Sequence, residues 1–103
     1  MASNPVLLIT GANNGLGLYT VKSLCRSKRA YTILLSGRNL EKANAAVKEV
    51  QQEFPGTLST ITCMQLDIED DDSISEGLKF ISNQYGRLDI LINNAGEWLS
   101  VRR

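Results

Sequence analysis

A glycine-rich stretch near the amino terminus carries residue types that can hold a diphosphate. Residues 10–17 read T-G-A-N-N-G-L-G, after the apolar run 6–9 and before a helical pattern of apolar residues. Glycines let a backbone approach a ligand closely, and the unpaired N–H groups in the first turn of a helix point toward an anion. Gly11 would form the turn, Gly15 would admit the pyrophosphate, and Gly17 would let the helix lie close to the strand. The strand before the loop and the helix after it favour nucleotide binding over a simple tight turn.

Residues at the ends of the later apolar runs extend this set of candidate contacts. Parallel strands end at one edge of a sheet, so residues that follow the runs would lie near the glycine-rich loop. The candidate cofactor contacts in the loop are Thr10, Gly11, Asn13, Asn14, Gly15, Leu16 and Gly17. Those after the later runs are Ser36, Arg38, Asp67, Ile68, Asn93, Asn94, Ala95 and Gly96.

The end of the second apolar run indicates which dinucleotide would bind, NAD(H) or NADP(H). An NAD-preferring site usually places a carboxylate there to bind the ribose 2′-hydroxyl. Ser36 stands at that position instead, and Arg38 follows two residues later. A guanidinium can hold phosphate oxygens through two hydrogen bonds at once, whereas the alternative, a solvated arginine at a helix start, does not suit the helix dipole. We therefore predict NADP(H) over NAD(H), with an added hydroxyl contact from Ser36.

Apolar periodicity predicts four strands and three helices in alternation. The strands are 6–10, 32–35, 60–66 and 88–92, and the helices begin near Gly15, Asn39 and Asp70. Asn39 and Asp70 are suited to cap helices, and Gly86 to end one. Crossover helices between strands imply a parallel sheet covered on both faces. The predicted fold class is α/β, a Rossmann-type doubly wound parallel sheet truncated to four strands in the order 3-2-1-4, with a binding crevice between strands 1 and 4.

Composition argues against several other classes of function. The 103 residues carry 11 Lys plus Arg against 11 Asp plus Glu, so no net charge favours nucleic acid or a membrane surface. Histidine is absent, and Cys25 and Cys63 lack metal-ligand spacing, so we expect reduced, buried thiols and a cytoplasmic location. The acidic run 69–72 fits a helix N-terminus better than a metal site. The first apolar run is too short for a membrane span.

Two intact motifs in one frame resemble the classical short-chain dehydrogenase/reductase family. They are T-G-x-x-x-G-x-G at 10–17 and N-N-A-G at 93–96, and Asp67 stands where the family places an aspartate near the adenine ring. The resemblance runs from Val6 to about Gly96, and several short stretches are most similar to carbonyl-reductase-like members. It implies an NADP-binding Rossmann half over 1–96 and a divergent tail over 97–103. Relatives often have a second basic residue where this chain has Asn14, which implies a softer preference for NADP.

The resemblance also implies a reaction, the transfer of hydride between the nicotinamide cofactor and a small carbonyl or alcohol. The family catalyses it with a Tyr and a Lys four positions apart and an upstream Ser. Tyr19, Tyr31 and Tyr85 are followed four residues later by Ser, Leu and Asp, so we assign no catalytic residue in this chain. We expect a truncated product, a splice form or an incomplete gene model. The alternative is a non-catalytic nucleotide-binding fragment without turnover.

The fourth predicted strand, 88–92, would form an unusual edge. It is apolar on both faces, as a central strand should be, yet no later strand is predicted to cover it. An open apolar edge exposes unpaired backbone groups and promotes association. We therefore expect self-association through this edge.

Overall fold

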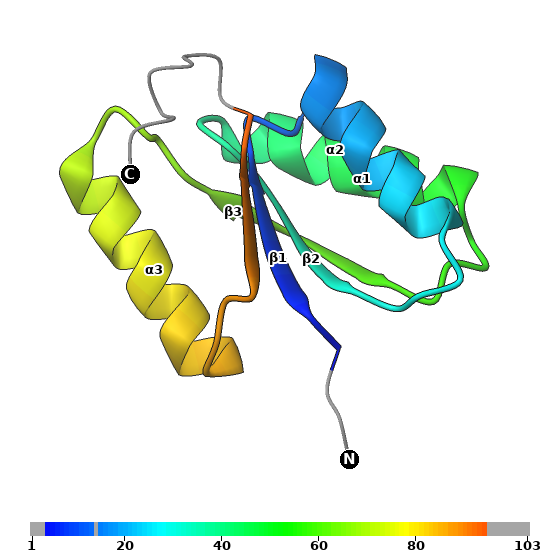
Figure 1. The fold of residues 1–103 in the computed structure, drawn as a ribbon. Coiled ribbons are helices and arrows are strands. Elements are labelled where there is room, and N and C mark those ends of the chain that lie inside the picture. Colours follow the sequence, from blue (N-terminus) through cyan, green and yellow to red (C-terminus); the bar gives the residue numbers. More distant parts are fainter. Residues whose placement is uncertain (1–3, 14, 95–103) are drawn as a thin grey trace.

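Strands and helices alternate along the chain and build a parallel sheet between two helical layers (Figure 1). The computed structural model describes residues 4–13 and 15–94. The elements are β1 (Val6–Thr10), α1 (Gly15–Arg26), β2 (Thr32–Gly37), α2 (Leu40–Glu53), β3 (Thr60–Gln65), α3 (Asp71–Tyr85) and β4 (Ile90–Asn93). The strands are all parallel and lie in the order β3-β2-β1-β4. The predicted fold class and strand order are confirmed.

Strand β1 is buried on both faces because it lies inside the sheet, between the two helical layers. Successive side chains of a strand point to opposite faces. Leu7 and Ile9 pack in a core cluster with residues of α1 and α2, whereas Val6 and Leu8 pack in a second cluster with Ile81 of α3. Figure 1 shows the corresponding layers, with α1 and α2 on one face of the sheet and α3 on the other. An uninterrupted apolar run is typical of such a central strand.

The predicted helix ends are confirmed by their hydrogen bonds. The Asn39 side-chain oxygen accepts the backbone N–H of Lys42 at 3.0 Å, which caps α2. The Asp70 carboxylate accepts the backbone N–H of Asp72 at 2.9 Å, which caps α3. Gly86 ends α3 with a φ of 75°, a left-handed conformation that favours glycine. These short-range signals set where each helix begins or ends, and hence where the connecting loops lie.

The apolar side chains of α3 are not all buried against the sheet. Ile81 is buried, but Leu78 is 48% exposed. Gly77 is buried instead, and a Cβ added there would lie 2.9 Å from the Cδ1 atom of Leu66. The helix therefore approaches the sheet through its glycine, and this orientation turns Leu78 outward.

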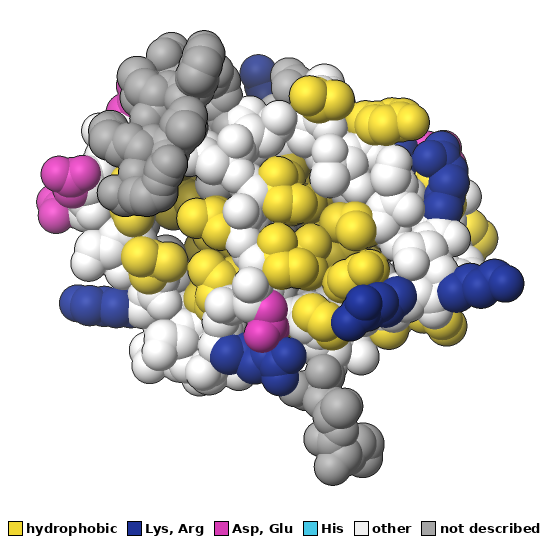
Figure 2. Space-filling view, viewed as in Figure 1, with side chains coloured by type: hydrophobic (Ala, Val, Ile, Leu, Met, Phe, Trp, Pro, Cys, Tyr) yellow, Lys and Arg dark blue, Asp and Glu magenta, His cyan; other side chains and the backbone are white. Residues whose placement is uncertain are grey.

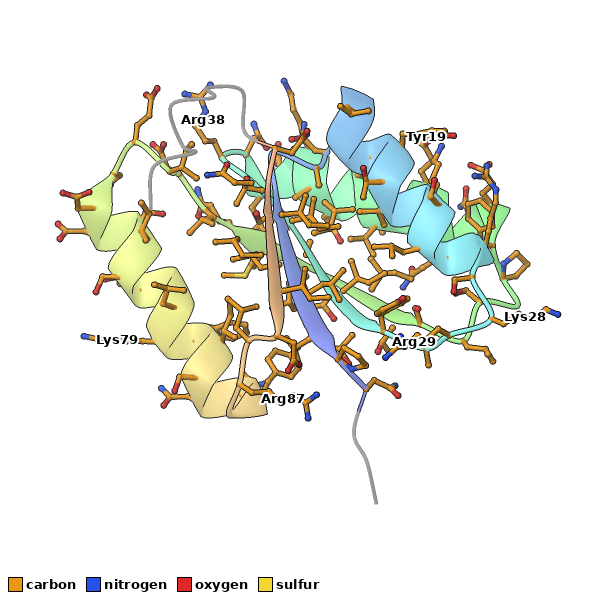
Figure 3. All side chains as sticks on the ribbon, viewed as in Figure 1. Tyr19, Lys28, Arg29, Arg38, Lys79 and Arg87 are labelled. Carbon is orange, nitrogen blue, oxygen red and sulfur yellow. The ribbon has the colours of Figure 1, made fainter. Side chains whose placement is uncertain are left out.

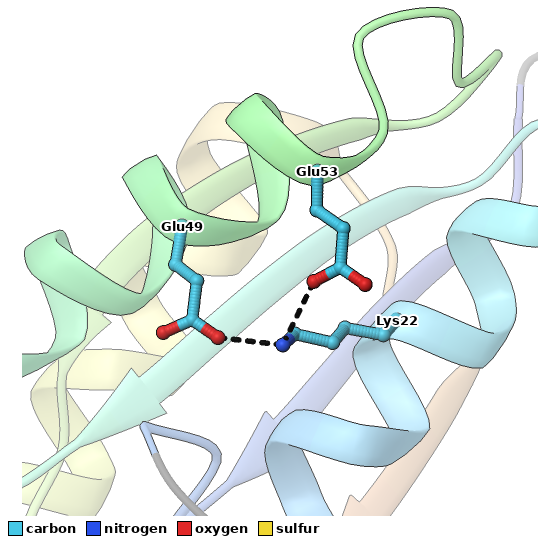
Figure 4. Close-up of polar contacts among 3 residues, drawn as sticks. All are labelled: Lys22, Glu49 and Glu53. Atoms are coloured by element: carbon cyan, nitrogen blue, oxygen red, sulfur yellow. Dashed lines mark hydrogen bonds and ion pairs between the residues drawn. The ribbon is translucent and has the colours of Figure 1, made fainter.

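An ion-pair cluster joins α1 to α2 on the same face of the sheet (Figure 4). The Lys22 ammonium lies 2.5 Å from a carboxylate oxygen of Glu49 and 2.9 Å from one of Glu53. Hydrogen bonds to these two carboxylates raise the pKa of Lys22 above its usual value. The cluster links two helices that follow different strands and so helps to set their relative positions.

Strand β4 exposes apolar side chains. Ile90 is 42% exposed and Leu91 is 55% exposed, and Figure 2 shows hydrophobic side chains gathered in the middle of the face that β4 crosses. Among the described residues, β3 and β4 are the two outermost strands. The thiol of Cys25 is buried as expected, whereas Cys63 is only partly buried. No helix in the described part of the chain is long and apolar enough to cross a membrane.

Candidate functional site

A cleft of about 690 Å³ lies at the carboxyl ends of the strands. Its lining comes from the glycine-rich loop, the end of β2, the first turn of α2, the segment after β3 and the end of β4. The lining residues are Gly11, Asn13, Gly15, Leu16, Gly37, Arg38, Asn39, Lys42, Leu66, Asp67, Ile68, Glu69 and Asn94. Eight of the sequence candidates meet here: Gly11, Asn13, Gly15, Leu16, Arg38, Asp67, Ile68 and Asn94. The candidates Asn14, Ala95 and Gly96 and the tail 97–103 lie outside the described residues.

The glycines of the loop serve two different physical needs. Gly11 and Gly15 have φ values of 59° and 60°, where a residue with a side chain would be strained. No atom lies within 4 Å of a Cβ built on Gly15, so this glycine borders open space. A Cβ on Gly17 would lie 2.8 Å from the carbonyl oxygen of Gly11 and 2.6 Å from the amide nitrogen of Asn94. Gly17 therefore lets α1 approach the glycine-rich loop and the end of β4.

Thr10 joins the carboxyl end of β1 to that of β4 through hydrogen bonds of its side chain. Its hydroxyl donates to the side-chain oxygen of Asn93 at 2.9 Å and accepts the backbone N–H of Asn94 at 2.9 Å. The Asn94 amide in turn donates to the carbonyl oxygen of Gly11 at 3.4 Å. Thr10 is only 3% exposed, and the cleft lining includes Asn94 but neither Thr10 nor Asn93. The structure gives Thr10 a bracing position behind the cleft, whereas Asn93 is exposed at the end of β4 and outside the cleft lining.

Ser36 lies differently from the expectation that its hydroxyl would face a ligand. Its side chain is fully buried, and the hydroxyl donates to the carbonyl oxygen of Ile9 at 3.0 Å. Its own carbonyl oxygen accepts the backbone N–H of Ala12 at 2.9 Å. Side chains alternate along β2, so Ser36 points away from the cleft while the backbone holds the glycine-rich loop. The Ser36 hydroxyl is therefore not presented to a molecule in the cleft.

One wall of the cleft carries two cationic side chains. Arg38 follows β2 directly, and Figure 3 places it at the edge of the sheet where the strands end. Lys42 lies in the first turn of α2 and lines the same cleft. Sequence reasoning missed Lys42. The sequence did contain a signal for it. Lys42 lies three residues after the Asn39 cap, so it belongs to the first turn of α2, close to Arg38 at the end of β2.

The neighbouring part of the cleft begins at Asp67, which follows β3. Its backbone N–H donates to the Ser73 hydroxyl at 2.9 Å, and its carboxylate accepts the backbone N–H of Glu69 at 3.0 Å. These bonds hold the turn between β3 and α3. Leu66 and Ile68 beside Asp67 also line the cleft. Apolar side chains next to acids suit a neutral, flat ring better than a phosphate, so this part of the cleft differs from the part at Arg38 and Lys42 in the groups that it could hold.

The tyrosines lie apart from the cleft. Tyr19 is 60% exposed on α1, and Figure 3 shows it on the outer side of that helix. Tyr31 and Tyr85 pack at the edges of the two core clusters. Within the described ranges, the cleft lining includes no tyrosine, and no group of His, Cys, Asp or Glu is arranged to hold a metal ion. What the cleft offers is a glycine-rich turn, a helix N-terminus, two cations and an apolar wall, a set that could hold a dinucleotide.

Comparisons with known proteins agree with this arrangement. Short-chain dehydrogenase anuI of Penicillium roqueforti (strain FM164) is 44% identical over 94 residues, which cover 91% of this chain and 36% of the relative. Carbonyl reductase (NADPH) 1 of Bos taurus is 41% identical over 95 residues, which cover 92% of this chain and 32% of the relative. The structure of menthone neomenthol reductase from Mentha piperita matches with a TM-score of 0.82 at 31% identity, over 93% of this chain and 33% of the reductase.

The chain spans about a third of the length of the curated relatives it matches. The family model for short chain dehydrogenases matches residues 5–102, which is nearly the whole chain. This match and the shared parallel sheet lead to one conclusion: the chain belongs to the short-chain dehydrogenase family.

Proposed function

We propose that this chain binds NADP(H) and is the cofactor-binding part of a short-chain oxidoreductase. Its reaction would be the transfer of hydride between the nicotinamide and a small carbonyl or alcohol. One observation carries the choice of cofactor: Arg38 and Lys42 line the same wall of the cleft, next to the glycine-rich loop. Two cations at this place suit a phosphate on the ribose, where a carboxylate would repel it. In this proposal residues 1–96 form the cofactor-binding unit and 97–103 a divergent tail.

Each part of the cleft has a role in this proposal. The backbone of Gly11 and Gly15 and the N-terminus of α1 hold the diphosphate. Arg38 and Lys42 bind the 2′-phosphate, and Asp67 lies with its apolar neighbours beside the adenine ring. Leu16, Asn94 and the sequence candidates Asn14, Ala95 and Gly96 contact the remainder of the cofactor. The cofactor, when bound, supplies or accepts the hydride.

Similar proteins bind either nicotinamide cofactor. The structure of a metagenomic short-chain oxidoreductase in complex with NADP matches with a TM-score of 0.77 at 27% identity, over 92% of this chain and 40% of that one. An oxidoreductase from Haemophilus influenza with bound NAD matches with a TM-score of 0.74 at 30% identity. Family membership alone does not choose between the cofactors, so the choice depends on Arg38 and Lys42.

Titration of NADPH and NADH into the wild type and two variants tests the proposal. We expect the wild type to bind NADPH more tightly. Arg38→Ala and Lys42→Ala should each weaken NADPH binding by about tenfold or more, because each removes a charged hydrogen bond, and leave NADH binding nearly unchanged. Lys28→Ala is the matched control, since Lys28 is an exposed cation in the loop that follows α1 (Figure 3). Equal affinity of the wild type for both cofactors would contradict the choice of NADP(H).

A second candidate function is a nucleotide-binding module without turnover. It is favoured by the absence of any Tyr followed four residues later by Lys in the 103 residues, and by the absence of tyrosine from the described cleft lining. We expect the 103-residue chain to bind NADPH but not to oxidise it in the presence of reactive carbonyls. Cofactor-specific turnover by the purified chain, measured as loss of NADPH absorbance, would contradict this second candidate.

We also propose that the chain associates with a second copy of itself through β4. The exposed Ile90 and Leu91 and the outermost position of this strand in the described sheet support it. Sedimentation velocity should detect dimers or larger species that are lost in Leu91→Lys. Leu58→Lys is the control, because Leu58 is 62% exposed but lies in the loop between α2 and β3. A wild type that stays monomeric at high concentration would contradict the association.

A further inference from the structure

Gly37 and Asn13 meet where the end of β2 approaches the glycine-rich loop. A Cβ added to Gly37 would lie 2.7 Å from the Oδ1 atom of Asn13 and 3.4 Å from its Cγ atom. Among the described glycines, those with a positive φ are Gly11, Gly15 and Gly86, so the backbone of Gly37 would accept a side chain. Glycine is needed at position 37 for space and not for conformation.

The backbone on both sides of this contact is held in place. The Ala12 N–H donates to the Ser36 carbonyl oxygen at 2.9 Å, directly beside the Asn13–Gly37 contact. The Leu66 N–H donates to the Gly37 carbonyl oxygen at 2.9 Å from the other side. Gly37 is also buried within β2. A side chain at position 37 would therefore displace the short Asn13 side chain before it moved the strand.

The position of Asn13 in the cleft determines which part of a bound cofactor its side-chain amide would contact. Asn13, Gly37 and Arg38 all line the cleft. In the proposed function the diphosphate lies at the glycine-rich loop and the 2′-phosphate at Arg38. The group that joins those two phosphates in the cofactor is the adenosine ribose, so an amide between them faces that sugar. An amide offers both a donor and an acceptor, which suits a sugar hydroxyl and its neighbouring phosphate oxygen.

We infer that Gly37 is a positioning residue for the cofactor: its missing side chain lets the Asn13 amide lie against β2 and contact the sugar beside Arg38. The inference rests on the proposed NADP(H) function. It assigns Gly37 a role through Asn13 and no contact of its own with the reacting atoms. The role requires that the effects of changing the two residues be coupled, because Gly37 acts only while the Asn13 side chain is present.

A double-mutant cycle on NADPH binding tests the coupling. The dissociation constant is measured for the wild type, Gly37→Ala, Asn13→Ala and the double variant, and the melting temperature of each is recorded. We expect each single variant to weaken binding by roughly fivefold, the loss of one hydrogen bond, and the double variant to bind no more weakly than Asn13→Ala. Gly56→Ala is the matched control, since no atom lies within 4 Å of a Cβ built there, and it should bind like the wild type.

Three binding results would each overturn the inference. They are unchanged binding in Gly37→Ala, unchanged binding in Asn13→Ala, and a double variant whose loss is the product of the two single losses. If Gly37→Ala alone fails to fold, the double variant must fold again, because the clash is with the Asn13 side chain; an unfolded double variant would also overturn it. A wild type that binds no NADPH contradicts the proposed function itself, so the two failures are distinguishable.

Discussion

The hydroxyl of Thr10 donates to the side-chain oxygen of Asn93 at 2.9 Å and thereby joins the carboxyl ends of β1 and β4. These residues lie 83 positions apart and belong to the two motifs that carry the family resemblance. The same hydroxyl accepts the N–H of Asn94, whose side chain reaches the Gly11 carbonyl oxygen. The two motifs thus form one hydrogen-bonded unit, in which Thr10 supports the loop that we propose to hold the diphosphate.

Thr10→Val is expected to destabilise the protein by about 1 kcal/mol, because it keeps the shape of the side chain but removes the acceptor of the part-buried Asn94 N–H and the donor to the Asn93 side chain. Urea unfolding followed by circular dichroism measures the change. Thr20→Val is the matched control, since the Thr20 hydroxyl bonds only to Leu16 within the exposed surface of α1. Equal losses in the two variants would show that Thr10 has no special role in joining the strands.

Asp89 is expected to make the start of β4 sensitive to acid. Its carboxylate accepts hydrogen bonds from the Arg87 side chain at 2.7 Å and from the Val6 N–H at 2.8 Å, and these bonds lower the pKa of Asp89 below its ordinary value of 3.8. A lowered pKa in the folded state stabilises the fold above the unfolded pKa, and this contribution is lost as the pH falls through the folded value.

Asp89→Asn should therefore lower the free energy of unfolding at neutral pH, and the gap from the wild type should shrink below about pH 4. Denaturant unfolding between neutral and acid pH measures this gap. Glu76→Gln, which removes one negative charge from the exposed surface of α3, controls for net charge. A gap that stays constant over the whole pH range would contradict the assignment to the Asp89 carboxylate.

Lys22→Met is expected to loosen the packing of α1 against α2 (Figure 4). The side chain is 19% exposed and contacts the carboxylates of Glu49 and Glu53, which raise the pKa of Lys22 above 10.5. A raised pKa gives stability below the unfolded value that is lost as the pH rises through the folded value. The melting temperature should fall slightly at neutral pH, by less than in Thr10→Val, and the difference should narrow in alkali.

High salt should reduce the same effect, because screening weakens ion pairs near the surface. Lys48→Met is the control, since Lys48 is an exposed lysine of α2, the helix that carries Glu49 and Glu53. If the two methionine variants melt at the same temperature at every pH and salt concentration, the Lys22 cluster contributes no stability of its own.

The sequence by itself determined the order of strands and helices, the helix ends at Asn39, Asp70 and Gly86, and the place of the glycine-rich loop. Each of these depends on residues near one another in the chain. Apolar periodicity follows from whether an element is buried on one face or two, and a cap bonds within a single turn. The fold class and the strand order could therefore be predicted before any contact was known.

Only the tertiary structure decided which side chains of those elements face the cleft. Lys42 faces it because the end of β2 sets the position of the start of α2. The Ser36 hydroxyl instead bonds to Ile9 of the neighbouring strand β1, because side chains alternate between the two faces of β2. Leu78 is exposed because Gly77 gives α3 its close approach to the sheet. These outcomes depend on contacts between segments far apart in the chain, and a local pattern of residue types contains no information about which segment will lie opposite.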